Sequence, residues 1–325
     1  MPILNKSRLF FVAVVVVVMF CFQVFQKASN GVISVGFDRN VYTSKKPPDP
    51  YSDLVIIYNR IPKTGSTSFM SVLYSLYEKN MFSVIYVNVT SRNRRFTFKD
   101  QNLFARNITT WVERKPAIYH GHFPFLNFQV MGFKQPVYVN IVREPLERLV
   151  SYYYFMRYGD TFLPKKRRKH QGDKRSFDEC VKQKSNMCDA SKLWLQIPFF
   201  CGSDPECWVH GNKKALERAK FNVVNYYFLV GVTEHIDQFV EFLESTIPSI
   251  FSGAMELFTK DGGVHIRKTK VKKPLKEETL EHFRNDPIYQ MEYEFYMFVK
   301  DRFTDIARYS NNKVKVAYGK IKPDP

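Results

Sequence analysis

One lysine and a run of hydroxyl side chains lie between an apolar stretch and a helical pattern near residue 60. Residues 54–58 are apolar, and Arg-Ile-Pro-Lys-Thr-Gly-Ser-Thr-Ser then runs from Arg60 to Ser68. This order predicts a strand, a tight loop and a first helical turn, where unpaired backbone N–H groups and the helix dipole attract anions. The candidate phosphate-binding residues are Lys63, Thr64, Gly65, Ser66, Thr67 and Ser68.

A second junction of the same kind follows the apolar run 136–142. Arg143 comes directly after this run, and Ser151 lies eight residues further along. The first loop is not a Walker motif, because that motif places its lysine after the last glycine, whereas Lys63 precedes Gly65. Alone, the first loop could be a solvated turn, and Arg143 could form a surface salt bridge with Glu144 or Glu147. Two such sites in one chain indicate a nucleotide that carries phosphates at both ends.

The sequence Tyr-His-Gly-His, which ends at His122, offers two candidate general bases. It follows a predicted strand at 115–120, and alternate residues of a strand point to the same side, so His120 and His122 can share one. Histidine ionises near pH 6.5, which suits a base that removes a proton from a hydroxyl group. The alternative is a structural pair bonded to loop backbone, and we expect this for one of the two.

Alternating strand and helix patterns predict an α/β fold with a central parallel sheet flanked by helices. The predicted strands are 54–58, 83–88, 115–120, 136–142 and 226–231. The predicted helices are 67–79, 101–112, 146–158, 235–246 and a C-terminal helix that includes 291–306. The length of 325 residues suffices for one sizeable core.

The N-terminus predicts a type II membrane anchor. Residues 9–25 are almost wholly apolar, and the preceding residues 1–8 contain two basic side chains, which favour a cytoplasmic tail. A cleaved signal peptide is less consistent with the sequence, because no small-residue cleavage site follows. Residues 26–50 lack periodicity and are predicted to form a mobile stem, so that residues 51–325 form the lumenal domain.

Cysteines and glycosylation sequons agree with a lumenal position. Four cysteines lie within a short segment at Cys180, Cys188, Cys201 and Cys207. Three pairings are possible, and short loops favour joining the first two and the last two. Free thiols or a zinc site are alternatives, although the spacing lacks the C-x₂-C pair typical of zinc. Asn88 and Asn107 begin Asn-x-Thr sequons that would carry glycans in this compartment.

The net charge of +18, from 49 Lys and Arg against 31 Asp and Glu, favours a polyanionic partner. Basic residues cluster at 92–95, 165–175 and 267–273. One such run is commonly a solvated loop, but three within a folded chain indicate a binding groove. We expect no nucleic acid partner in the lumen, where a sulfated glycan is the fitting polyanion.

Together these motifs resemble the heparan sulfate 2-O-sulfotransferases of the Golgi. The loop around Lys63 and the His-Gly-His segment carry the resemblance, with Gln-Gly-Asp-Lys ending at Lys174 and Leu-Trp-Leu-Gln-Ile-Pro-Phe-Phe-Cys-Gly ending at Gly202. It covers about residues 51–308. It implies a P-loop-like sulfotransferase fold, the same two disulfides, a homotrimer, and attachment to the Golgi membrane.

The resemblance also implies the donor, 3′-phosphoadenosine 5′-phosphosulfate (PAPS). In this family the loop containing Lys63 holds the 5′-phosphosulfate, and Arg143 and Ser151 hold the 3′-phosphate. Thr269 and Lys272 are implied to close over the donor. The leaving group is already a stable phosphate, so we expect no metal.

For the acceptor, the resemblance implies His122 as the general base, with His120 assisting. The implied glycan contacts are Arg60, Tyr74, Arg168 and Arg267. The expected reaction is in-line transfer to the 2-O position of hexuronic acid, chiefly iduronic acid, in heparan sulfate. The alternatives are a dermatan or chondroitin uronyl 2-O-sulfotransferase and a non-catalytic heparan-binding protein. A nucleotide kinase fits least, since no acidic metal-binding motif is apparent.

Overall fold

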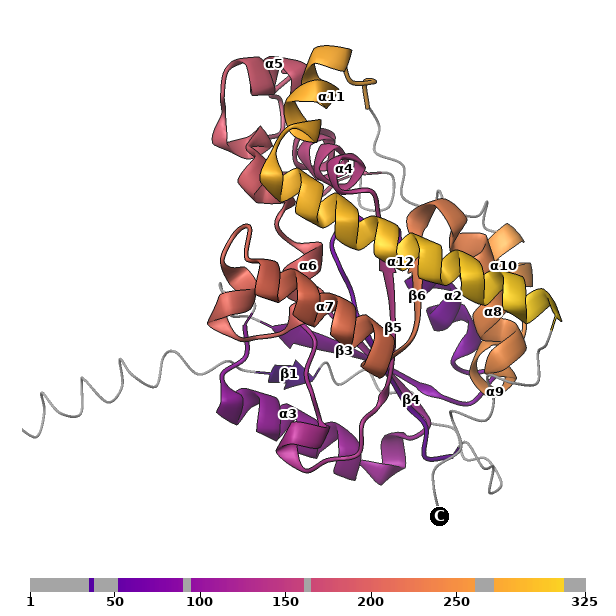
Figure 1. Ribbon diagram of the computed structural model, residues 1–325. Helices are drawn as coiled ribbons and strands as arrows, with labels where there is room; N and C mark the ends of the chain where they lie inside the picture. Colours follow the sequence, from indigo (N-terminus) through magenta and orange to yellow (C-terminus); the bar gives the residue numbers. More distant parts are fainter. Residues whose placement is uncertain (1–34, 38–51, 90–94, 161–164, 261–271, 313–325) are drawn as a thin grey trace, which may run out of the picture.

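A six-stranded sheet forms the centre of the computed structural model, which describes residues 35–37, 52–89, 95–160, 165–260 and 272–312 (Figure 1). The strand order is β1-β3-β4-β2-β5-β6, and all neighbours are parallel except β1, which pairs antiparallel with β3. The strands are β1 (Val35–Phe37), β2 (Val55–Asn59), β3 (Ser83–Val89), β4 (Ala117–Gly121), β5 (Val137–Val142) and β6 (Tyr227–Val232). The predicted α/β fold with a central parallel sheet is confirmed.

Helices surround this sheet. They are α2 (Ser66–Leu76), α3 (Phe98–Thr110), α4 (Pro145–Tyr158), α5 (Phe177–Lys182), α6 (Gln196–Cys201), α7 (Lys213–Tyr226), α8 (Ile236–Thr246), α9 (Pro248–Phe251), α10 (Ala254–Lys260), α11 (Glu277–Arg284) and α12 (Pro287–Asn312). Side-chain caps set the start of α3, α4, α5 and α7. Helix α3 begins three residues before its predicted start. Thr97 and Asp100 form a capping box there, so polar residues set the start of the helix ahead of its apolar pattern.

The long helix α12 connects two parts of the molecule. It packs against β6 and α7 and runs from the lobe formed by α4, α5 and α11 to the neighbourhood of α8 (Figure 1). The main apolar core lies around the sheet, whereas a second apolar cluster fills this lobe. The lobe therefore has a small core of its own, and α4 joins it to the end of β5.

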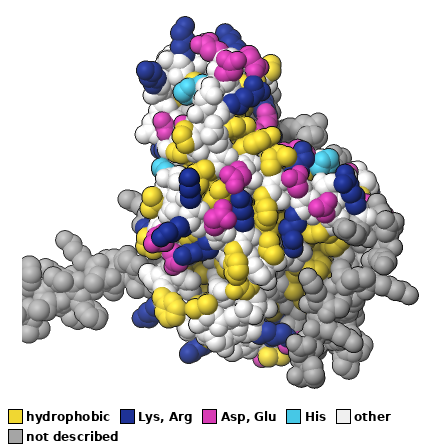
Figure 2. Space-filling model, in the orientation of Figure 1, with side chains coloured by type: hydrophobic (Ala, Val, Ile, Leu, Met, Phe, Trp, Pro, Cys, Tyr) yellow, Lys and Arg dark blue, Asp and Glu magenta, His cyan; other side chains and the backbone are white. Residues whose placement is uncertain are grey.

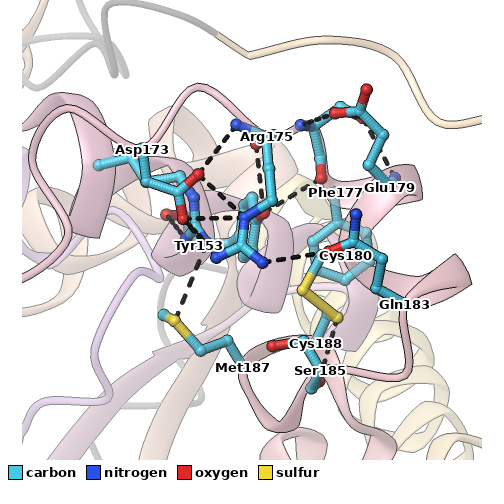
Figure 3. Close-up of a disulfide and its surroundings, with 12 residues drawn as sticks. Tyr153, Asp173, Arg175, Phe177, Glu179, Cys180, Gln183, Ser185, Met187 and Cys188 are labelled. Atoms are coloured by element: carbon cyan, nitrogen blue, oxygen red, sulfur yellow. Dashed lines mark hydrogen bonds and ion pairs between the residues drawn. A yellow bond between two sulfur atoms is a disulfide. The ribbon is translucent and has the colours of Figure 1, made fainter.

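Both predicted disulfides are present, Cys180–Cys188 and Cys201–Cys207. The first closes the lobe beside α5, where Figure 3 shows it next to a group of charged side chains. Asp173 accepts hydrogen bonds from Arg175 and, at 3.0 Å, from the buried Arg157 on the last turn of α4. This carboxylate thereby joins the basic segment 165–175 to the helix that precedes it.

Two predictions concern the N-terminal part of the chain, an anchor at residues 9–25 and a stem at residues 26–50. The predicted anchor lies outside the described residues, and none of the helices within them is long and apolar enough to cross a membrane. Strand β1 lies within the predicted stem. Its three residues pair with the sheet edge, which composition alone did not indicate.

Candidate active site

The loop between β2 and α2 has an unusual backbone. Lys63 has φ +73° and Gly65 has φ +77°, both in the left-handed region that few side-chain-bearing residues adopt. Thr64, between them, is buried and donates its hydroxyl hydrogen to the Ile61 carbonyl at 3.0 Å. The loop thus turns tightly into the first turn of α2, where the Ser68 N–H donates to the Gly65 carbonyl at 3.0 Å. The strain at Lys63 is of the kind found at ligand-binding loops.

The second loop lies beside the first, because β5 is the parallel neighbour of β2 and their carboxyl ends meet at one sheet edge. The Arg143 guanidinium donates to the Lys63 carbonyl at 3.5 Å and to the Glu147 carboxylate at 3.2 Å. Lys272, from the segment before α11, also pairs with Glu147. Residues that the sequence assigned to one donor molecule therefore converge.

An open cleft of about 290 Å³ lies over both loops. Nine of the predicted site residues line it: Arg60, Lys63, Gly65, Ser66, Thr67, Ser68, His122, Arg143 and Ser151. Pro62, Tyr152, Phe155 and Thr233 complete the lining and were not indicated by the sequence reasoning. The wall combines three cations (Arg60, Lys63 and Arg143), several hydroxyl groups and a helix N-terminus, which together suit an anionic ligand.

His122 is held as a base would be. Its Nδ1 lies 2.8 Å from the Arg60 carbonyl oxygen, which can only accept a hydrogen bond, so Nδ1 carries the proton that is donated. In the neutral ring Nε2 is then the basic nitrogen. Because His122 lines the cleft, this nitrogen belongs to a side chain placed to meet an acceptor hydroxyl.

His120 is placed differently and does not line the cleft. It is buried, with Arg60 donating to its Nδ1 at 3.2 Å and the Tyr74 hydroxyl 2.8 Å from its Nε2. A guanidinium only donates, so Nδ1 accepts and Nε2–H donates to Tyr74. Burial, with the charges of Arg60 and His122, holds the pKa of His120 well below its usual value. His120 is therefore a neutral link between Arg60 and Tyr74.

The Phe155 ring connects the donor loop to the basic segment. The Lys63 ammonium lies 4.2 Å from the ring centroid, and the Arg168 guanidinium carbon lies 4.3 Å from it. Arg168 also pairs with the buried Asp160 at 3.4 Å. Such cation–π contacts stabilise by about 0.5–2 kcal/mol. The only sequence signal for Phe155 is its place at the end of a run of aromatic residues on α4.

The remaining predicted residues are placed as follows. Tyr74 is half exposed on α2, and Asn88 is exposed on β3, whereas Asn107 is partly buried on α3. Arg267 and Thr269 lie outside the described residues. Within the part of the chain that the structure describes, no group of three or more His, Cys, Asp or Glu side chains is arranged to hold a metal ion.

Comparisons with known proteins agree with this geometry. A family model described as the sulfotransferase family matches residues 51–299. The chain is 49% identical over 256 residues to heparan sulfate 2-O-sulfotransferase 1 of Gallus gallus, covering 78% of this chain and 72% of that protein. It is 47% identical over 263 residues to the Homo sapiens protein of the same name, covering 81% and 74%. It is 44% identical over 296 residues to the heparin sulfate O-sulfotransferase of Drosophila melanogaster, covering 89% and 85%.

Proposed function

The chain belongs to the sulfotransferase family, and on this basis we propose that it transfers the sulfuryl group of PAPS to the 2-O position of hexuronic acid, chiefly iduronic acid, in heparan sulfate. The family carries the reaction class and implies PAPS as donor. The assignment of heparan sulfate as the acceptor rests on the names of the relatives. The observation that carries the site assignment is the convergence of two anion-binding loops and an oriented histidine on one cleft.

The donor fits the two loops at its two charged ends. Lys63 and the N-terminus of α2 hold the 5′-phosphosulfate, and Arg143 and Ser151 hold the 3′-phosphate. Negative charge grows on the bridging oxygen as the sulfur–oxygen bond breaks, so a cation placed there stabilises the transition state more than the ground state. Lys63 lines the cleft and is the cation for that position.

For the acceptor, Nε2 of His122 takes the proton of the 2-hydroxyl as its oxygen bonds to sulfur. The Arg60 carbonyl fixes the ring and stabilises the imidazolium that forms. Arg60 lines the cleft and is joined through His120 to Tyr74, and these two residues are assigned to the acceptor. Arg168 shares the Phe155 ring with Lys63, and it is assigned to the glycan.

We propose, further, that the enzyme is anchored in the Golgi membrane by residues 9–25, with residues 1–8 cytoplasmic and the domain that begins at residue 51 in the lumen. Two disulfides support an oxidising compartment. Glycans on Asn88 and Asn107 and a homotrimer belong to the same proposal. These rest on sequence pattern and resemblance.

The deciding experiment offers the full chain PAPS with a labelled sulfuryl group and three acceptors: N-sulfated heparosan that contains iduronic acid, dermatan and chondroitin. We expect label at the 2-O position of hexuronic acid in the first. Labelling of dermatan or chondroitin instead would favour the uronyl 2-O-sulfotransferase alternative. Heparin binding without transfer to any acceptor would favour a non-catalytic binding protein.

A further inference from the structure

A buried side-chain amide forms hydrogen bonds with the backbone of Arg143. Gln196, the first residue of α6, is fully buried. Its Oε1 accepts a hydrogen bond from the Arg143 N–H at 2.9 Å, and its Nε2 donates to the Arg143 carbonyl at 2.9 Å. The amide thus pairs with both polar backbone groups of Arg143, as a neighbouring strand would, at the point where β5 has ended.

Glu292 on α12 holds this amide in turn. Its fully buried carboxylate accepts from the backbone N–H of Leu195 at 2.8 Å and of Ile197 at 3.1 Å. Its second oxygen lies 3.5 Å from Nε2 of Gln196. Burial raises the pKa of Glu292 to about 7, against the opposing effects of Arg148 and of these N–H groups. Above that pH the carboxylate only accepts hydrogen bonds, so it fixes which end of the amide faces it.

Arg148 connects the segment before α6 to α4. Gln196, Glu292 and Arg148 together are called the frame. It is buried and donates to the Lys192 carbonyl at 3.0 Å and to the Leu193 carbonyl at 3.2 Å. Helix α4 also carries Ser151, the other residue assigned to the 3′-phosphate. The frame therefore determines the positions of both parts of one anion site.

We propose that Gln196 is a positioning residue for the 3′-phosphate site, with Glu292 locking its amide. The inference rests on the proposed function, in which Arg143 binds that phosphate. The Arg143 guanidinium extends from a backbone that Gln196 alone holds through both its N–H and its carbonyl, within the part of the chain that the structure describes. Loss of the amide frees this backbone to rotate, which moves the guanidinium away from the phosphate. The 5′ loop loses with it only the 3.5 Å hydrogen bond from the guanidinium to the Lys63 carbonyl, so the 5′ site is expected to change less than the 3′ site.

The test compares two nucleotides, 3′,5′-ADP and 5′-AMP, which differ only in the 3′-phosphate. For Gln196→Met we expect the affinity for 3′,5′-ADP to fall about tenfold, the order of one lost hydrogen bond to a charged group. The affinity for 5′-AMP is expected to fall much less, because the 5′ loop loses only the hydrogen bond from Arg143 to the Lys63 carbonyl. The KM for PAPS is expected to rise, with kcat at saturating PAPS nearly retained.

Asn222→Leu on α7 is the matched control. Asn222 is a buried amide that donates to the carbonyls of Phe200 at 2.8 Å and Cys201 at 3.2 Å, at the other end of α6. Its loss is expected to lower stability comparably but to leave the preference for 3′,5′-ADP intact. Equal losses of that preference in the Asn222 and Gln196 variants would show a general effect of loosening α6 and would overturn the positioning role.

Two more variants separate the possible failures. If Arg143→Ala keeps the full preference for 3′,5′-ADP, the proposed 3′-phosphate site itself is wrong. If Arg143→Ala loses it and Gln196→Met does not, only the positioning role is overturned. Glu292→Gln, measured at pH 8, presents an NH₂ group towards the Gln196 amide and keeps the shape. It is expected to lose part of the preference, and it replaces Gln196→Met should that variant not fold.

Discussion

The two histidines of the His-Gly-His segment receive different roles from their hydrogen bonds. Their spacing predicts that both lie at one strand end, and this is so. It could not predict that Arg60 would donate to one ring through its guanidinium and accept from the other through its carbonyl. The contacts come from a loop about 60 residues earlier in the chain, so pairing in the sheet, and not local pattern, decides which ring is neutral and buried.

The first prediction separates these roles. His122→Ala is expected to lower turnover about 10²–10⁴-fold, the usual contribution of a general base, with the affinity for 3′,5′-ADP nearly unchanged. His120→Gln is expected to keep the acidic limb of the pH profile of kcat/KM, because His120 does not titrate as the base. Initial rates from pH 5 to 8 check both. A His122→Ala enzyme that turns over at the wild-type rate would contradict the assignment.

A second prediction follows from the low pKa of His120. Between its folded pKa and the unfolded value near 6.5, the unfolded chain binds a proton that the folded chain does not. Stability is therefore expected to fall as the pH drops from 7 to 5, and to fall less steeply in His120→Gln. Urea denaturation at each pH measures this. Parallel curves for the two proteins would show that His120 does not contribute.

Among the helices and strands, accuracy followed the strength of the local pattern. All five predicted strands lie within two residues of their expected bounds, because apolar runs between turns are clear signals. Helix α7 was not predicted, although its buried residues Ala215, Leu216, Ala219 and Val223 have helical spacing. Helices α5, α6, α9, α10 and α11 were not predicted, since each has eight residues or fewer and gains its stability from packing. Gln196 was missed for the same reason. An uncharged glutamine in an apolar segment has no marked spacing, and its partners come from β5 and α12.

The third prediction concerns the last turn of α4. Asp173 is the carboxylate partner of Arg157, whose side chain is only 1% exposed. Asp173→Asn is expected to destabilise the fold by about 3 kcal/mol, because a buried guanidinium loses its counter-charge. Arg175→Gln removes an exposed partner of the same carboxylate and is expected to cost less than about 1 kcal/mol. Thermal unfolding distinguishes them. A larger loss in Arg175→Gln would locate the important ion pair on the surface.

At the scale of the whole molecule, the net charge is +18, but on the face that carries α12 it does not form one continuous basic surface. Figure 2 shows acidic and basic side chains interleaved on the face that carries α12. Within the basic segment, Lys165, Lys166 and Arg167 are exposed, whereas Arg168 is turned inward to Asp160 and Phe155. Composition predicted the polyanionic partner. It could not show that Lys165, Lys166 and Arg167 face solvent while Arg168 lies against the Phe155 ring.

The fourth prediction uses that difference in exposure. Replacing both Lys165 and Lys166 by Gln is expected to weaken heparin binding and to flatten the slope of log affinity against log salt, by roughly one unit per lost ionic contact. The matched control replaces the exposed Lys213 and Lys214 of α7 by Gln, with the same change in net charge. Binding at several salt concentrations measures both slopes. Equal changes in the two pairs would indicate attraction by overall charge without a defined groove.

The place of Glu292 on the last helix has a consequence for the order in which the protein is made. Synthesis proceeds from the N-terminus, so both anion-binding loops emerge long before residue 292 of the 325-residue chain. The N–H groups of Leu195 and Ile197 cannot meet their carboxylate until α12 has emerged and docked. Until then, the nascent chain lacks the contacts of Glu292 that hold Gln196, and through it the backbone of Arg143, in place. Competence to bind nucleotide tightly would be acquired only after α12 has docked.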